Sequence, residues 1–536
     1  MKKIINFLIT TVIVVIAAYI YYYITLPAVN IHSPGFWIFV IAALVIICAV
    51  VGFATANIDK SGKRNPGPFF KNKLFLIAIS ITGIMIGVYI IGSVLSSPIV
   101  NAKKYQQLIT VTDRNFTEDI KEISYKDIPI LDKESASLLG SRKMGSMVEF
   151  VSQFEVADNY TQINYQGIPT RVTPLKYGNL VKWFTNRSEG IPAYLRIDMT
   201  TQEVSLIKLK QGIKYSEAEH FSRNIYRHLR FNYPSYIFDN INFEIDDDGI
   251  PYWICPVKDY TIGLFGGQTI SRVVMVNAIT GDHADYAINE VPTWVDRVFS
   301  AELLISLYDY YGTLKHGYWN SVFGQRDALQ TTDGYNYIAL DDDVWVYTGV
   351  TSVGSDESNV GFILMNQRTA ETRYYSISGA EEFSAMSSAE GKVQHLGYRA
   401  TFPLLLNIGG KPTYFLALKD AAGLVKQYAM VNVEQYQIVA IGDTVNQCEK
   451  TYLEQMKTSG FSVDTTKMPK ITGVIAKIAE GVVDGNSHYY IMLENNDAIF
   501  DVNVVDFLQI IKYNVGDIIT FTYSEGAISN NVVGVE

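Results

Sequence analysis

The chain has 536 residues and a net charge of −10 at neutral pH, with 48% hydrophobic and 18% charged residues. That length exceeds what one hydrophobic core normally supports, so several domains are expected. Residues 1–96 carry seven basic residues and one acidic residue, which leaves a net charge of −16 on the remainder, so no nucleic-acid partner is expected.

Three apolar runs near the N-terminus predict transmembrane helices. They are Ile4–Ile24, Phe36–Ala54 and Leu74–Val94, and none contains a charged residue. Each is long enough to cross a hydrocarbon core of roughly 30 Å. The alternatives are a cleaved signal peptide for the first run and buried core helices for the others. Tyrosines at 21–23 stand where a cleavage site needs small residues, so we expect a three-helix transmembrane region over residues 1–96.

Basic residues in the short flanks predict the orientation of these helices. Lys2 and Lys3 precede the first run, Leu26–Gly35 has no Lys or Arg, and Asn57–Lys73 carries five. Cationic loops stay in the cytoplasm. We therefore expect a multi-pass protein of the cell membrane that contacts the lipid bilayer through residues 4–96. Its N-terminus is predicted in the cytoplasm and residues 97–536 outside it.

Residues 97–159 are charged and irregular, with one predicted helix near Ser135–Met147, and we interpret them as a stalk or collar. Beyond them, short runs of Val, Ile, Tyr and Trp alternate with clusters of Gly, Pro, Asn and Asp. This pattern is typical of antiparallel hairpins.

An internal repeat organises the region after the stalk. Ser216–Phe221 reads SEAEHF and Ser378–Phe383 reads SGAEEF, so four of six positions are identical at an offset of 162. A serine followed three residues later by glutamate is a capping box, which satisfies two backbone N–H groups at a helix start. We therefore predict a helix beginning at each serine.

Further matches follow in the same order along the chain. Each copy has a Gly-x-Pro that leads into an aromatic strand ending at Lys258 or Lys419, and each copy ends in a predicted helix. The other matched segments are Arg230–Pro234 with Arg399–Pro403, Val274–Asn277 with Ala429–Asn432, and Arg196–Glu203 with Leu364–Glu371. The predicted repeats span 160–312 and 335–457, with a linker at 313–334.

The first copy suggests a family. The strand Phe243–Gly249, the aromatic strand after it and the turn within Val276–Asp282 resemble the PepSY module, a small α+β unit with a helix packed on an antiparallel sheet. The match is weaker in the second copy, which lacks the acidic turn before Gly410. The resemblance implies a location outside the cytoplasmic membrane and a non-catalytic role as companion or inhibitor of a peptidase. The whole architecture also resembles a group of membrane proteins from Gram-positive bacteria.

The C-terminal part changes character after a polar linker at 458–469. Residues 470–536 contain five strand-like stretches, with the apolar stretch Val504–Ile511 between the third and the fourth. That order resembles a small OB-type barrel. Its nine acidic residues against three lysines favour a structural or protein-contacting barrel over one that binds oligonucleotides.

Catalytic patterns are weak throughout the sequence. His220 and His228 lack the spacing of a metal-hydrolase pair. Ser205 and Lys208 form a Ser-x-x-Lys match, but residues three apart in a strand point to opposite faces. The glycine-rich Gly263–Gln268 is predicted to be a hairpin turn. We therefore expect no catalytic, cofactor-binding or metal-binding residues.

Two smaller questions stay open in the sequence. The triplets Asp246–Asp248 and Asp341–Asp343 could offer oxygen ligands to calcium, although solvated turns are favoured because the loop spacing of a calcium site is missing. A disulfide between Cys255 and Cys448 is possible, although buried free thiols are favoured.

The predicted fold class is a membrane-anchored α+β protein with three N-terminal transmembrane helices, two PepSY-like repeats and a C-terminal OB-like barrel. Its expected function is that of a non-enzymatic cell-envelope protein whose repeats bind or scaffold another component, either a peptidase or a wall polymer. The alternative is an accessory or sensor subunit whose helices contact a polytopic membrane partner. The oligomeric state is not readable from the sequence.

Overall fold

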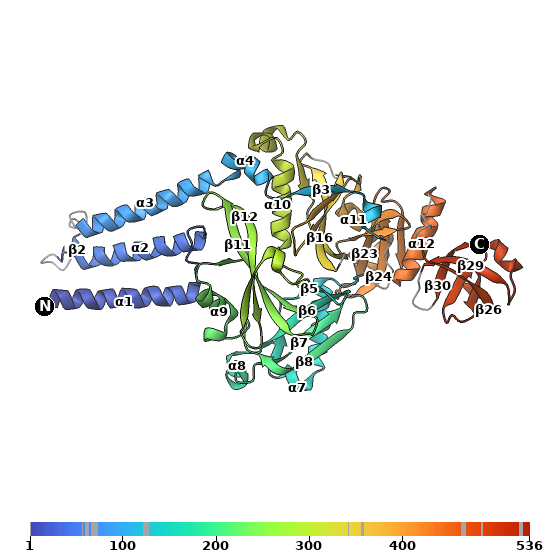
Figure 1. Ribbon diagram of the computed structural model, residues 1–536, viewed down its shortest axis with the longest axis horizontal. Coiled ribbons are helices and arrows are strands. Elements are labelled where there is room, and N and C mark those ends of the chain that lie inside the picture. Colours follow the sequence, from blue (N-terminus) through green and yellow to red (C-terminus); the bar gives the residue numbers. More distant parts are fainter. Residues whose placement is uncertain are drawn as a thin grey trace.

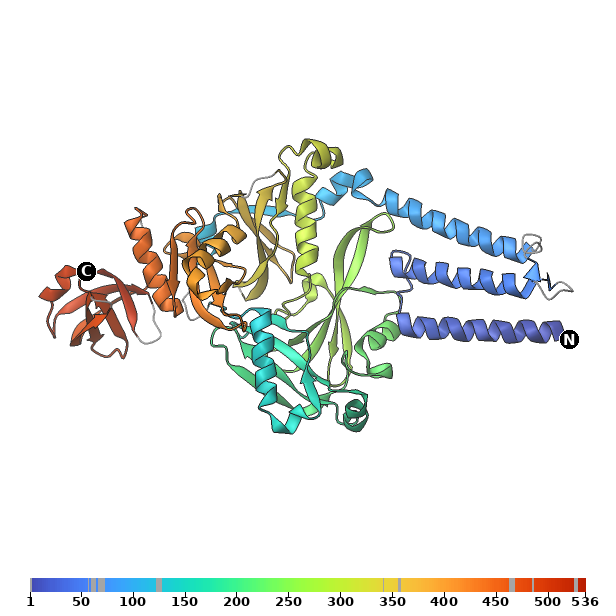
Figure 2. The ribbon, with the colours of Figure 1, turned by 180° about the vertical axis from the view of Figure 1, so that it is seen from behind.

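The computed structural model describes residues 2–536 except 56, 59–63, 66–72, 122–127, 341, 355–357, 462–467, 484–485 and 525–528. The chain folds as a mixed α+β protein with several separate sheets. Figure 1 shows the N-terminal helices at one end, a central body of sheets and helices, and a small barrel at the other end. Figure 2 shows the same arrangement from behind.

The N-terminal region forms helices α1 (Lys2–Thr25), α2 (Pro34–Thr55) and α3 (Lys73–Leu95). Of the described residues, only Phe75–Leu95 forms a helix long and apolar enough to cross a membrane. The described apolar parts of the other two, Val15–Thr25 and Pro34–Ala49, are shorter than 18 residues. At 1.5 Å per residue they fall short of roughly 30 Å of hydrocarbon. The prediction of three membrane-spanning helices is therefore wrong.

The body-side ends of these helices are fixed to the central body. Arg230 Nε donates to the backbone oxygen of Leu26, 2.9 Å away, just beyond the end of α1. Ser96 Oγ, after α3, accepts the backbone N–H groups of Leu264 and Phe265 at 2.8 and 3.2 Å. Those two residues form the tip of the predicted Gly263–Gln268 hairpin. Lys60, Lys63 and Lys71 of the predicted basic loop lie outside the described residues.

The first module contains two antiparallel five-stranded sheets. Along the chain, α9 (Ile225–Asn232) lies between the two sheets and α8 (Leu180–Asn186) lies between two strands of the first sheet. The first sheet has the order β4-β6-β7-β8, with β5 paired to β6. Its strands are β4 (Phe154–Val156), β5 (Thr161–Tyr165), β6 (Ile168–Tyr177), β7 (Ile191–Asp198) and β8 (Val204–Ile213). The second sheet contains β9 (Ile237–Phe238), β10 (Asn242–Ile245), β11 (Pro251–Ile262), β12 (Gly266–Asn277) and β13 (His283–Ala287), and α10 (Ala301–Thr313) follows it.

The second module repeats this plan. Its first sheet contains β14 (Leu329–Thr331), β15 (Asn336–Leu340), β16 (Asp343–Ser352), β18 (Gly361–Asn366) and β19 (Thr372–Tyr375). Helix α11 (Glu382–Lys392) follows, and β17 (Ser358–Asn359) pairs with β20 (Gly379–Ala380). The second sheet contains β21 (Arg399–Ala400), β22 (Leu404–Ile408), β23 (Lys411–Lys419), β24 (Val425–Asn432) and β25 (Val439–Gly442), and α12 (Val445–Thr458) follows it.

The two modules share a strand register as well as an element order. In the first, the β11–β12 pairing shifts between Val257 and Lys258, where the short strand β9 also pairs. In the second, the β23–β24 pairing shifts between Leu418 and Lys419, where β21 pairs. The lysine that was matched between the copies therefore marks the same irregularity in both sheets.

The helix starts differ from the predicted capping boxes. Ser216 lies in an isolated bridge with Asn224, and α9 begins at Ile225 with Asn224 as its cap. Ser378 precedes the short strand β20, and α11 begins at Glu382. Both predicted caps are wrong. In the first copy, Glu219 accepts the Tyr177 hydroxyl and the Trp183 indole N–H at 2.6 and 2.8 Å, so the carboxylate does not reach back to the serine.

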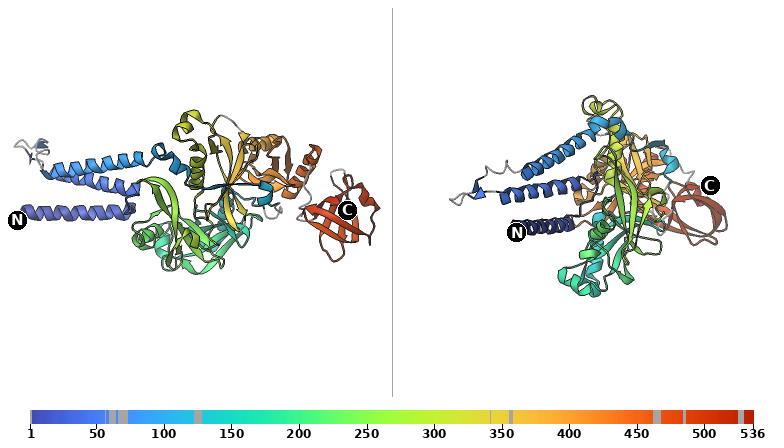
Figure 3. Two further views of the ribbon diagram at one scale, coloured as in Figure 1. Left: turned by 45° about the horizontal axis from the view of Figure 1, so that its top comes forward. Right: turned by 60° about the vertical axis from the view of Figure 1, so that its left-hand side comes forward.

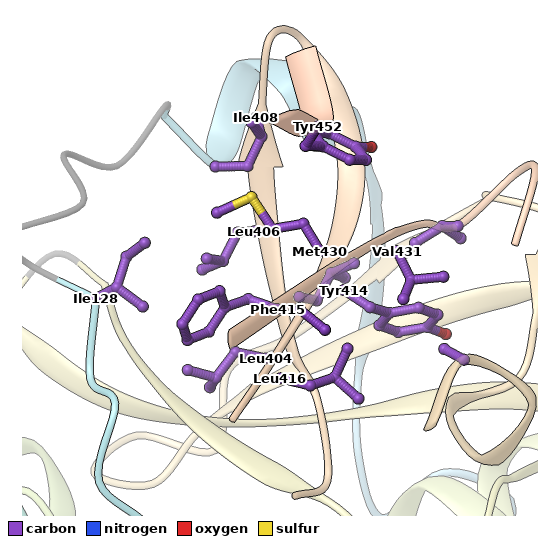
Figure 4. Packing of buried hydrophobic residues seen from close by; sticks show 14 of the residues in the cluster. Ile128, Leu404, Leu406, Ile408, Tyr414, Phe415, Leu416, Met430, Val431 and Tyr452 are labelled. Atoms are coloured by element: carbon purple, nitrogen blue, oxygen red, sulfur yellow. The ribbon is translucent and has the colours of Figure 1, made fainter. Parts of the chain in front are cut away.

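Buried side chains join the modules into one body. Along β11, Trp253 and Cys255 face the core of the first module, whereas Ile254 faces α10. Along β16, Val346 faces the same α10 layer and Trp345 faces the core of the second module. Figure 4 shows that second core around Phe415, Leu406 and Tyr452. Sheets and helices thus alternate through the body, since successive strand residues point to opposite faces.

The segment predicted as a stalk takes part in this body. It contains α4 (Pro98–Gln106), β3 (Val111–Arg114), α5 (Phe116–Asp119), α6 (Lys133–Gly145) and α7 (Val148–Val151). Strand β3 pairs in parallel with β19, and Phe116 and Ile120 enter the core of the second module. The described parts of residues 97–159 therefore contact both modules. Figure 3 gives two further views of the body between the N-terminal helices and the barrel.

The C-terminal strands close into a barrel in the order β26-β27-β28-β30-β29. They are β26 (Lys470–Val483), β27 (Asn486–Leu493), β28 (Ile499–Asn503), β29 (Ile518–Ser524) and β30 (Asn530–Val535), and the barrel has its own core. Cys255 and Cys448 are both free and lie in the cores of different modules.

Candidate functional site: an inter-module cleft

Two adjoining cavities open where both modules meet the start of α6. One has a volume of 630 Å³ and is lined mainly by the first module, and the other has a volume of 490 Å³ and is lined by both modules. They share Lys133, Tyr160, Arg297 and Glu302, so together they form one inter-module cleft. Cavities of this size are typical of small-ligand sites.

Arg171 is the most unusual residue of the cleft. It lies on β6 with 5% of its surface exposed, on the face opposite the buried Val172. One guanidinium nitrogen donates to Gln162 Oε1 at 3.2 Å, and Nε has no hydrogen-bond partner. Burial lowers the pKa of Arg171 to about 10; the nearby Tyr337 and Asp132 partly oppose this shift, and the charge of Arg297 adds to it. At neutral pH the cleft therefore contains a buried positive charge.

Arg297 brings a second guanidinium to the cleft from the turn before α10. Its Nη2 donates to the hydroxyl of Tyr337 at 3.1 Å, and its Nε has no partner. Among the ion pairs of the described residues, neither Arg171 nor Arg297 contacts a carboxylate. Both residues also line the smaller cavity. Guanidinium groups bind carboxylate or phosphate oxygens well, because their planar set of N–H donors matches those groups in charge and shape.

The acidic residues of the cleft already have partners. Asp132 and Glu134 both accept from Lys419 Nζ. Although burial would raise the pKa of Asp132, hydrogen bonds from Lys419 and Ser135 hold it below its ordinary value. Glu302 Oε1 accepts the hydroxyl of Tyr335 at 2.7 Å. The positive charges of the arginines are therefore not neutralised by direct contact with these carboxylates.

A buried glutamate positions Arg297. Glu244 on β10 is fully buried, and its carboxylate accepts the backbone N–H groups of Asp296 and Arg297 at 2.9 and 3.0 Å. Asp296 in turn accepts the backbone N–H of Asn164 on β5 at 2.6 Å. Burial raises the pKa of Glu244 to about 7 and raises that of Asp296 as well. This buried pair fixes the turn that carries Arg297 against the first sheet.

The histidines of the two modules lie elsewhere. His220 packs against the Trp183 ring with centroids 4.6 Å apart, and His283 Nδ1 is 2.8 Å from the Tyr233 hydroxyl. His395 lies in a short turn after α11. No histidine is among the described residues that line the cleft. Lys208 of the Ser-x-x-Lys match pairs with Glu149 at 2.8 Å.

The acidic triplets are engaged in turns and ion pairs. Asp246 Oδ1 accepts the backbone N–H groups of Asp248 and Ile250, which closes the β10–β11 turn. Asp343 forms a two-point ion pair with Arg368 at 2.7 and 2.8 Å. Asp341 lies outside the described residues. In the part of the chain that the structure describes, no cluster of three or more His, Cys, Asp or Glu side chains is arranged to hold a metal ion.

Arg171 and Arg297 were not singled out by the sequence. Residues 168–175 are otherwise Ile, Pro, Thr, Val and Leu, and the charged Arg171 among them was the one available signal. Nothing local marks Arg297, which reaches the cleft only because Glu244 holds its backbone.

Comparison with known proteins identifies no relative. No family model matches the chain and no curated protein matches it. Among solved structures, a mutant levansucrase from B. megaterium aligns with a TM-score of 0.18 and 11% identity, covering 78% of this chain and 97% of that one. An ACO/RPE65 chimera aligns with a TM-score of 0.14 and 8% identity, covering 68% of this chain and 62% of that one.

Proposed function

We propose that this chain is a membrane-attached binding protein of the cell envelope that works by contact and not by catalysis. Its inter-module cleft holds an anionic group, a carboxylate or a phosphate, of a small ligand or of an envelope component such as a wall polymer. The observation that carries this proposal is Arg171, a buried cation that lines the cleft and forms no ion pair among the described residues.

The physical reason is the cost of burying a charge that has no direct ion-pair partner. Burying a cation without a counter-charge is unfavourable by several kcal/mol, and a bound anion would remove most of that cost. Arg297 and the exposed Lys133 at the rim add two further positive charges, whereas the acidic residues that line the same cleft already accept from lysine or tyrosine side chains. A planar, bidentate anion such as a carboxylate would match a guanidinium in both charge and shape.

The setting of this function is also proposed. The two modules are of the PepSY-like type, the region after residue 97 is extracytoplasmic, and α3 attaches the chain to the membrane. In support, α3 is apolar along its described length and only 6% of its apolar window is buried within the protein. A peptidase that carries an acidic surface group is the other class of partner that fits the cleft.

A second candidate function is an accessory subunit that passes a signal between the cleft and a membrane partner. The observation in its favour is the direct contact between helix ends and the first module, where Val29 N–H donates to the backbone oxygen of Pro234 at 2.7 Å. Ligand-dependent cross-linking to a polytopic protein would favour this candidate over the first.

The test measures stabilisation by anions. Inorganic phosphate and citrate, each compared with sodium chloride at equal ionic strength, should raise the unfolding midpoint of the detergent-solubilised full chain. A ligand at a hundred times its dissociation constant adds about 2.7 kcal/mol. Arg171→Met should abolish the shift. Arg196→Met is the matched control, because Arg196 lies on the adjacent strand β7 over the Tyr165 ring and does not line the cleft.

An unchanged midpoint of the wild type in both anions would contradict the anion proposal. An equal shift in wild type and Arg171→Met would show that the anions act elsewhere on the protein. In both cases the Arg196→Met control must show the same increase in unfolding midpoint as the wild type.

A further inference from the structure

An apolar patch lies on the surface of the first module at α8. Its members are large apolar side chains that are mostly exposed, namely Leu180 (64%), Val181 (68%), Phe184 (62%) and Phe221 (63%). The first three share one face of α8, since residues four apart in a helix are neighbours. Large apolar side chains gathered in this way usually mark an interaction surface.

Contacts of the neighbouring residues keep this patch exposed to solvent. Trp183, which precedes Phe184 on α8, is buried and donates its indole N–H to the buried Glu219 at 2.8 Å. The rings of Trp183 and Phe221 lie 6.0 Å apart, which brings the turn before α9 next to α8. Helix α8 therefore cannot rotate to cover its apolar face without breaking a buried hydrogen bond.

Basic residues surround the patch. The Arg187 guanidinium lies 4.7 Å from the Phe184 ring centroid, and Arg223 Nη1 donates to the backbone oxygen of Arg187 at 2.6 Å. Lys182 and Arg227 complete the basic rim. Two acidic residues, Glu189 and Glu217, lie nearby in the sequence, and Glu217 already accepts the Tyr226 hydroxyl. An apolar face with a cationic rim is the pattern of segments that lie in the headgroup layer of an anionic bilayer.

The patch is continuous with the attachment of the N-terminal helices. The Arg227 guanidinium stacks 4.5 Å from the ring centroid of Tyr23 on α1, and its Nη1 donates to the backbone oxygen of Phe221 at 2.8 Å. Figures 1 and 2 both show α8 on the side of the first module that faces these helices. The patch thus lies beside the point where α1 meets the body.

We infer that this α8 patch docks on the surface of the membrane that α3 enters, with its apolar side chains in the headgroup layer and its cations on anionic lipid. This inference rests on the proposed membrane attachment and is independent of the cleft. The docked surface fixes the body against the bilayer, so that the cleft is held at a constant height and tilt above it.

The experiment compares two exposed valines of the same module. Val181→Cys on α8 and Val148→Cys on α7, where Val148 is 84% exposed, are labelled with an environment-sensitive nitrobenzoxadiazole dye in a Cys48→Ala background. The thiols of Cys255 and Cys448 are buried and their pKa values are raised by burial, so they react slowly. The full chain is placed in nanodiscs of phosphatidylcholine alone or with one quarter phosphatidylglycerol.

In the anionic nanodiscs, iodide should quench the label at position 181 about threefold less than the label at position 148. Lys182→Glu combined with Arg187→Glu should restore quenching at 181 and leave 148 unchanged. Equal quenching at both positions in anionic nanodiscs would overturn the inference. A full chain that remained soluble without detergent or lipid would overturn both the inference and the membrane attachment.

Discussion

At the scale of single residues, the cleft depends on groups that are unfavourable in isolation. Arg171 is buried without a carboxylate partner, and Glu244 and Asp296 are buried acids whose pKa values are raised by burial. Such groups are rare in cores because desolvation penalises the charged form. All three residues serve the proposed anion site. Glu244 and Asp296 hold the turn that carries Arg297, and Arg171 lines the wall of the cleft, so the free-energy cost of burying these groups is tied to that site.

The first prediction concerns the charge of Arg171. Without an anion, Arg171→Met removes a buried charge while keeping an unbranched side chain of similar length. The free energy of unfolding should therefore rise by about 1–3 kcal/mol, by analogy with replaced buried ion pairs. The control Arg196→Met should change it by less than about 0.5 kcal/mol. Denaturant unfolding of the ligand-free protein measures both values, and a marked loss of stability in Arg171→Met would contradict the account of an unpaired charge.

The second prediction concerns pH. The folded-state pKa of Glu244, about 7, lies above its ordinary value of 4.5, so its stabilising contribution is complete at low pH and is lost as pH rises through 7. Glu244→Gln should remove that loss, so that the variant gains about 1–3 kcal/mol relative to wild type between pH 5 and pH 8. Glu203→Gln, an exposed acid of the first module, is the control. Identical pH profiles for wild type and Glu244→Gln would contradict the prediction.

At the scale of elements, the N-terminal ends of the helices show which features the sequence could predict and which it could not. The hairpins, the Gly-x-Pro strands and the order of elements follow from local patterns, because turn residues and alternation act over a few positions. The helix caps could not be predicted in this way, because Glu219 is hydrogen-bonded to Tyr177 and Trp183 from an earlier part of the chain. The cleft was not predictable for the same reason, since Arg171 and Arg297 meet only after both sheets have formed.

The third prediction concerns the cap of α9. Asn224 Oδ1 accepts the backbone N–H of Arg227 at 3.3 Å, so Asn224→Ala should lower the free energy of unfolding by about 1 kcal/mol. Ser216 Oγ is buried and has no hydrogen-bond partner, so Ser216→Ala should cost nothing or stabilise slightly. Urea unfolding of the two variants checks this order. A larger loss from Ser216→Ala than from Asn224→Ala would restore the capping box that the sequence suggested.

At the scale of the whole molecule, shared cores decide which parts behave as one body. The α10 layer contains Ile254 of the first module and Ile363 of the second, so neither module can open there without exposing the core of the other. The barrel differs, because its core is its own; among its described residues, Val533 packs against the second module. A cleft built between fused modules keeps its two walls at a fixed distance, which suits a pre-formed binding site.

The fourth prediction follows from this division into cooperative units. Ile363→Ala should cost about 2–5 kcal/mol through the cavity it leaves, and should speed hydrogen exchange in β11 and β23 together, because both modules depend on the α10 layer. Phe500→Ala in the barrel core should speed exchange in β28 and leave β11 unchanged. Mass spectrometry of native-state exchange resolves these strands separately. If Ile363→Ala affected β23 but not β11, the modules would be independent domains in contact, and the cleft would then be free to widen when a ligand enters.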